Sequence, residues 1–170
     1  MYIAEPGDIL LYRKPFAAYI PDIAIDLGEM LEDGPQPKYF FHCAIALNAN
    51  VKLEADGRRV AVHPIDYGKF EPYRPPIPRG RREKGLQYVE TMEGQRYDWI
   101  VDIDDGLRYL THNHVHLPVR WVQNIERHAK NCSDLVGAYF NKVMWGPKHF
   151  GLNTSPEDIW LAVKDYGVRG

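Results

Sequence analysis

The chain is poor in cysteine, and it lacks both a long apolar run and a large excess of charge of one sign. Its two cysteines, Cys43 and Cys132, are too few for a disulfide scaffold and do not have the spacing of a zinc site. No stretch approaches the ~20 apolar residues that cross a bilayer. The formal net charge of -2 gives no overall attraction to nucleic acid or to an anionic membrane. We therefore expect no nucleic-acid partner and no membrane span.

The N-terminal residues 1–8 lack the basic and apolar regions of a signal peptide. We therefore expect synthesis in the cytoplasm, which leaves the site of action open. The length of 170 residues predicts a single domain over 1–170, large enough to bury a core without disulfide or metal staples.

Strand-like segments come first and helix-like segments come later, which predicts an α+β fold. The strand-like segments are residues 9–13, 39–47, 51–55, 59–65 and 70–73. The helix-like segments are residues 81–93, 133–144 and a last helix with Ser155 as N-cap and Pro156 at its first position. Residues 99–110 read as helical or mixed, and residues 119–125 as strand or helix.

One histidine, His42, lies in the predicted strand over residues 39–47. Alternation places Phe41 and Cys43 on one face of this strand, and Phe40 and His42 on the other. Cys43 then lies among large apolar side chains, where a thiol is usually inert packing. We therefore do not expect Cys43 to be a nucleophile.

Cys132 lies where a polar loop turns into an amphipathic helix. Asn131 is a favoured N-cap residue and Asp134 fits a capping arrangement, so Cys132 is expected to be the first helical residue. The helix dipole stabilises a thiolate there and lowers its pKa from ~8.5. A nearby His42 would lower it further and later donate a proton. Glu54, on the next predicted strand, could orient that imidazole.

Several segments match a known family in their order along the chain. They are Gly7–Leu11, Phe41–Leu47, Glu54, Gly94–Trp99, Asn131–Val136 and Ser155–Trp160. Together they resemble the circularly permuted, NlpC-type papain-like hydrolases, which include bacterial permuted amidases and lecithin retinol acyltransferase-like proteins. The chain departs from the family pattern in its long stretch between Arg13 and Tyr39.

The resemblance implies a papain-like fold in which an antiparallel sheet or small barrel packs against helices, with the nucleophile at a helix N-terminus. It implies Cys132 as nucleophile, His42 as general base and acid, and Glu54 as the group that orients His42. The oxyanion would be held by the Cys132 backbone N–H and a second donor, for which Tyr12 is the candidate. The reaction needs no cofactor and no metal.

The resemblance also implies a substrate, since peptidoglycan stem peptides are the commonest substrates of this family. We expect amide hydrolysis of a peptide or of peptidoglycan, without a signal peptide to export the enzyme. This is compatible with a phage lysis or tail component assembled into a larger particle, with an effector delivered to the cell wall, or with a cytoplasmic enzyme.

Three other interpretations stay open at the level of sequence. His112, His114 and His116 alternate and could bind zinc or nickel, although an exposed loop before Pro118 is the preferred interpretation. The domain could be a binding module without turnover. It could also be a thiol acyltransferase or esterase acting on lipid, but that branch usually has a second histidine where this chain has Glu54.

Overall fold

A computed structural model describes residues 2–13, 40–96, 131–146, 149–151 and 154–168. It contains a five-stranded antiparallel sheet in the order β4-β3-β2-β1-β5. The strands are β1 (Ile9–Arg13), β2 (Phe40–Ala46), β3 (Val51–Ala55), β4 (Val60–Pro64) and β5 (Glu71–Tyr73). The segments predicted at 99–110 and 119–125 and the stretch between Arg13 and Tyr39 lie outside the described residues.

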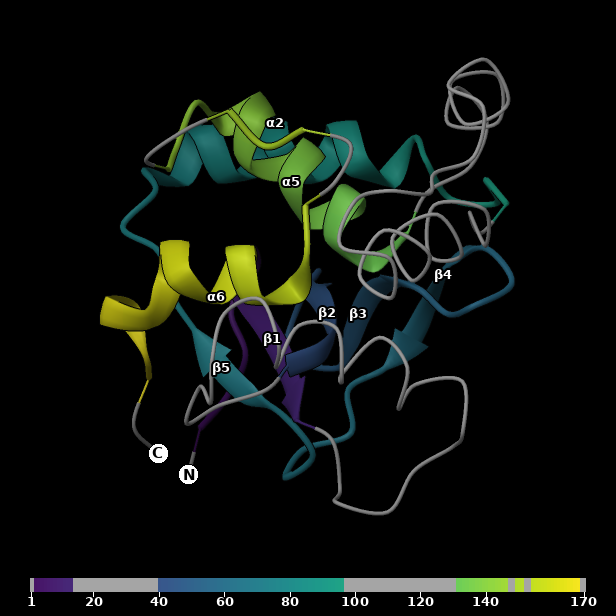
Figure 1. The fold of residues 1–170 in the computed structure, drawn as a ribbon, viewed down its shortest axis with the longest axis horizontal. Coiled ribbons are helices and arrows are strands. Elements are labelled where there is room, and N and C mark those ends of the chain that lie inside the picture. The colour runs from purple at the N-terminus through teal and green to yellow at the C-terminus, as the bar shows by residue number, and fades with distance from the viewer. Residues whose placement is uncertain (1, 14–39, 97–130, 147–148, 152–153, 169–170) are drawn as a thin grey trace, which may run out of the picture.

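Three α-helices lie on one side of this sheet, as Figure 1 shows. They are α2 (Arg79–Glu90), α5 (Cys132–Val143) and α6 (Pro156–Val163), and a short 3-10 turn, Lys164–Tyr166, follows α6. The predicted α+β class is therefore confirmed. Within the described ranges, every helix is too short or too polar to serve as a transmembrane segment.

The N-terminal ends of α5 and α6 are set by local capping hydrogen bonds. The Asn131 side chain caps α5 by accepting a hydrogen bond from the Asp134 backbone N–H. Ser155 caps α6 in a reciprocal capping box with Asp158, and Pro156 occupies the first turn. Both caps were predicted from the sequence, and both are confirmed.

The main core lies between the sheet and the helices. Residues at odd positions of the central strands point into it, as Ile9, Leu11 and Cys43 do, and they pack against apolar side chains of α5 such as Leu135 and Phe140. Residues at even positions point to the opposite face. A smaller apolar cluster lies there, made of Ala4, Leu10, Tyr12, Ala44, Ala46 and Ile65. The sheet therefore has two occupied faces, and β1 and β2 contribute to both.

A β-bulge corrects the predicted alternation at the start of β2. Tyr12 pairs with His42, but Arg13 pairs with Phe40, so Phe41 is skipped in the register. As a result Phe40 joins Cys43 in the main core, whereas Phe41 is 45% exposed. The prediction that Phe40 shares a face with His42 was wrong, because alternation holds only where the ladder is regular.

The Gly7–Asp8 turn is held by an ion pair between the buried Asp8 and the partly exposed Arg74. Asp8 is fully buried, and the Arg74 guanidinium donates to both of its carboxylate oxygens over 2.8 Å each. The Tyr2 hydroxyl donates a third hydrogen bond, at 2.7 Å. Gly7 has φ +86°, and a Cβ at this position would lie 2.4 Å from the Tyr139 hydroxyl. The turn therefore requires glycine, and it contacts both Arg74, which follows β5, and Tyr139 of α5.

Loss of the Arg74 side chain would leave the Asp8 carboxylate buried without its cation. We expect Arg74→Ala to lower the free energy of unfolding by about 3 kcal/mol, because breaking a buried pair strands one charge. Urea denaturation measures this change. Arg79→Ala is the matched control, since Arg79 is 92% exposed in its pair with Glu83 and should unfold near wild type. Equal stability of the two variants would contradict the assignment.

Candidate functional site

Cys132 is the first residue of α5, and its side chain is 5% exposed. Leu135, Val136 and the rest of the apolar face of α5 fix the helix against the sheet, so the start of the helix is fixed as well. The free N–H groups and the dipole of the first turn favour negative charge at this position. The helix therefore presents the sulfur in surroundings that suit a thiolate.

The Cys132 thiol and the ring of His42 on β2 lie close enough for each group to shift the pKa of the other. The two residues are far apart in sequence, and the packing of α5 on β2 brings them together. On its other side, His42 Nε2 lies 2.8 Å from Glu54 Oε2 on β3. The structure thus places the three predicted residues, Cys132, His42 and Glu54, in one connected chain of contacts.

The proximity of Cys132 and His42 shifts the pKa of both groups. Burial disfavours the charged imidazole, but the charge of Cys132, a hydrogen bond to its sulfur and the bond to Glu54 outweigh burial and raise the pKa of His42 to about 9. The pKa of the Cys132 thiol is held well below its ordinary value, first by a hydrogen bond from Cys43 and then by His42. The pair is thus suited to exist as thiolate and imidazolium near neutral pH.

Cys43 takes part in the site, which the sequence reasoning missed. Its side chain faces the main core, away from His42 as predicted, but its thiol and its backbone N–H both act on Cys132 and lower the pKa of the Cys132 thiol. Burial and the neighbouring Cys132 raise the pKa of Cys43 well above its ordinary value, so it remains a protonated donor. Its position directly after His42 in a strand was the one available signal.

The backbone N–H of Cys43 can reach Cys132 because the pairing of β2 with β3 is short. Pairing is recorded at Ile45 with Leu53 and at Ala46 with Lys52, next to the turn that joins the strands. Towards the start of β2 the strand no longer pairs with β3. The Cys43 backbone N–H can therefore donate to Cys132 in place of a β3 carbonyl.

Glu54 has a second partner that the sequence reasoning did not include. Lys52 Nζ donates a hydrogen bond to Glu54 Oε2 over 2.7 Å, so this one oxygen contacts both Lys52 and His42. Burial alone would raise the pKa of Glu54, but hydrogen bonds from His42 and Lys52, together with their charges, lower it below its ordinary value. Glu54 is therefore an ionised carboxylate with both of its close partners cationic.

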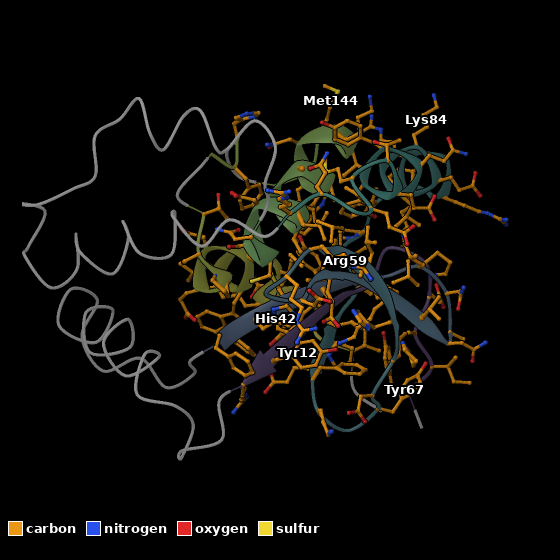
Figure 2. All side chains as sticks on the ribbon, turned by 90° about the vertical axis from the view of Figure 1, so that its right-hand side faces the viewer. Tyr12, His42, Arg59, Tyr67, Lys84 and Met144 are labelled. Atoms are coloured by element: carbon orange, nitrogen blue, oxygen red, sulfur yellow. The ribbon has the colours of Figure 1, made fainter. Side chains whose placement is uncertain are left out.

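Tyr12 lies directly beside His42, as Figure 2 shows, and the two residues pair across β1 and β2. Their ring centroids are 5.3 Å apart. Lys52 Nζ donates to the Tyr12 hydroxyl over 2.8 Å. Burial and the charge of Glu54 raise the pKa of Tyr12, so the hydroxyl keeps its proton. The candidate oxyanion donor thus borders the site, in a neutral form.

The predicted alternative metal site at His112, His114 and His116 lies outside the described residues. Within the described ranges, no group of three or more His, Cys, Asp or Glu side chains is arranged to hold a metal ion.

Comparison with protein-family models found no family that matches the chain, and comparison with curated proteins found no match either.

The hydrogen bond from Cys43 should be measurable in the reactivity of Cys132. We expect Cys43→Ala to move the midpoint of Cys132 alkylation by iodoacetamide upward by about one pH unit, because the thiolate loses a donor to its charged form. Peptide mass spectrometry follows the labelling of Cys132 against pH. Cys43→Ser, which keeps a donor, is the control and should stay near wild type. An unchanged midpoint in Cys43→Ala would show that Cys43 serves only as packing.

Proposed function

We propose that this protein is a cysteine hydrolase of the circularly permuted, NlpC-type papain-like kind, and that it cleaves an amide bond. The observation that supports this most directly is the placement of Cys132 beside His42, whose Nε2 lies 2.8 Å from Glu54 Oε2. A thiol beside an imidazole that a third group orients is the arrangement that nucleophilic catalysis by cysteine requires.

The chemistry would proceed in two steps. In the first, the Cys132 thiolate forms a bond to the amide carbonyl carbon, and His42 gives its proton to the leaving amine as the C–N bond breaks. In the second, His42 takes a proton from water, the hydroxide adds to the thioester, and the carboxylic acid leaves with the thiolate restored. With Nε2 on Glu54, the Nδ1 atom of His42 would carry the exchanged proton.

The negative charge that develops on the carbonyl oxygen needs donors. The Cys132 backbone N–H at the start of α5 supplies one, because the first N–H groups of a helix have no intrahelical carbonyl partner. The Tyr12 hydroxyl is our candidate for the second. Lys52 can only donate, so the hydrogen bond between these two residues leaves the tyrosine proton for an oxyanion.

The proposed substrate is a peptide amide, with peptidoglycan stem peptides as the first class to test, as the family resemblance implies. The proposed setting is a phage lysis or tail component, a delivered effector or a cytoplasmic enzyme. Incubation with purified peptidoglycan fragments and with model acyl lipids, followed by mass spectrometry, tests the reaction class. Cleaved stem peptides support the proposal. Acylated protein with a deacylated lipid would favour acyl transfer, and no product from either would favour a binding module.

The assignment of the nucleophile predicts a simple pattern among variants. Cys132→Ala and His42→Ala should each reduce turnover by about a thousandfold or more, because each removes a group that makes or breaks bonds. Their thermal melting should stay close to wild type, since Glu54 keeps Lys52 as partner in the His42 variant. A variant that retains turnover, or loss of turnover in Cys43→Ser with activity kept in Cys132→Ala, would contradict the assignment.

The ionised pair also fixes the pH dependence. The reactive state needs Cys132 deprotonated and His42 protonated, so activity should rise through the lowered pKa of Cys132 and fall through the pKa of His42, about 9. We therefore expect kcat/KM to be maximal near neutral pH and to decline only as the pH approaches 9. A profile that declines through the ordinary histidine pKa, near ~6.5, would show that the pair is not coupled.

A further inference from the structure

Lys52 is a buried lysine on the face of the sheet opposite the main core. It is 7% exposed, and buried lysine side chains are rare unless they are paired. Its Nζ atom has two short hydrogen bonds, to Glu54 Oε2 at 2.7 Å and to the Tyr12 hydroxyl at 2.8 Å. The ammonium also lies 4.5 Å from the centroid of the Tyr12 ring. Lys52 is therefore held tightly between two residues that flank His42.

The shared carboxylate oxygen connects this lysine to the proposed nucleophile. Glu54 Oε2 contacts Lys52 on one side and His42 on the other, so a rotation of the carboxylate would break two charge-assisted hydrogen bonds. In the ionised site the charges alternate in sign from Lys52 through Glu54 and His42 to Cys132. Lys52 offsets the charge of Glu54, which would otherwise act unbalanced on the histidine and cysteine.

Other ionisable groups near Lys52 are few among the described residues. Those that face it or its partners are Tyr12 from β1, His42 and Cys43 from β2, Glu54 from its own strand, His63 from β4 and Asp66. The charges of Cys43 and Asp66 act on Tyr12. His63 lies directly opposite Lys52 in the β3–β4 register, but its Nε2 contacts Asp56 Oδ2 at 3.0 Å and it is more exposed. The close, buried partners are Tyr12 and Glu54.

We propose that Lys52 is a positioning residue of this site: its positive charge fixes the Glu54 carboxylate against His42 and balances that carboxylate, and so sets the pH range in which Cys132 is reactive. The proposal rests on the proposed function for its consequence in catalysis. Its physical content concerns the reactivity of one thiol, which can be measured without any substrate.

Removal of the Lys52 charge should change the site in a defined direction. Without the cation the site is more negative, so protonated forms gain stability and both Cys132 and His42 should titrate at higher pH. In Lys52→Met we expect the midpoint of Cys132 alkylation by iodoacetamide to rise by about one pH unit. At a pH below that midpoint, labelling should slow about tenfold. Glu54→Gln removes the anion, so its midpoint should move to lower pH.

Two controls separate this role from a merely structural one. Lys52→Arg keeps the charge and should return the midpoint to within a fraction of a pH unit of wild type. Lys69→Met removes a lysine that is 71% exposed in a surface pair with Asp66, and it should leave the midpoint unchanged. Circular dichroism on each variant reports whether it is folded. Should Lys52→Met be too unstable to purify, Lys52→Gln removes the charge but keeps a donor, and it carries the same test.

The outcomes divide cleanly. The proposal is supported if the midpoint of Cys132 alkylation rises in Lys52→Met or Lys52→Gln and stays near wild type in Lys52→Arg. This holds even if no substrate is ever cleaved and the proposed hydrolysis fails. A wild-type midpoint in folded Lys52→Met or Lys52→Gln overturns it, even if the wild-type protein hydrolyses peptidoglycan. An equal rise of the midpoint in Lys52→Arg also overturns it, because the effect would then come from packing and not from charge.

Discussion

The packing of the start of α5 against β2 is the contact on which the rest of the site depends. The apolar face of the helix, with Leu135, Val136 and Phe140 in the main core, fixes the height and rotation of its first turn. Because the helix begins at Cys132, that turn holds the sulfur within reach of His42. A shift of the helix by one residue would rotate the sulfur by about 100° away from the strand. The precision of the site therefore comes from the core beneath it.

The sheet serves two purposes because its side chains alternate. One face supplies apolar residues to the main core, and the other face carries the polar residues Tyr12, His42, Lys52 and Glu54. Charges at this depth are stable only when each has an opposite partner and its hydrogen bonds are made. Glu54 lies between two cations, so the charges on this face offset one another. The same balance gives the proposed chemistry an ionised thiol.

Much of the site could be predicted from sequence because its determinants are local. Asn131 predicts the start of α5, and strand alternation puts His42 and Glu54 on one face of neighbouring strands. Alternation failed at Phe40 and Phe41, where a bulge changes the register and no residue type signals it. Lys52 has the same parity as Glu54 on β3, but lysine side chains are mostly exposed, so its residue type does not indicate a buried position.

The sequence by itself determined the helix caps, the order of strands and helices, and which residues could share a face, since these depend on neighbours along the chain. Only the tertiary structure decided that Cys132 meets both His42 and the thiol of Cys43, and that Lys52 is buried against Glu54. Those contacts join segments that are distant in sequence. Their geometry depends on how whole helices and strands pack and on the combined electrostatic field of several charges. A local sequence pattern contains neither of these.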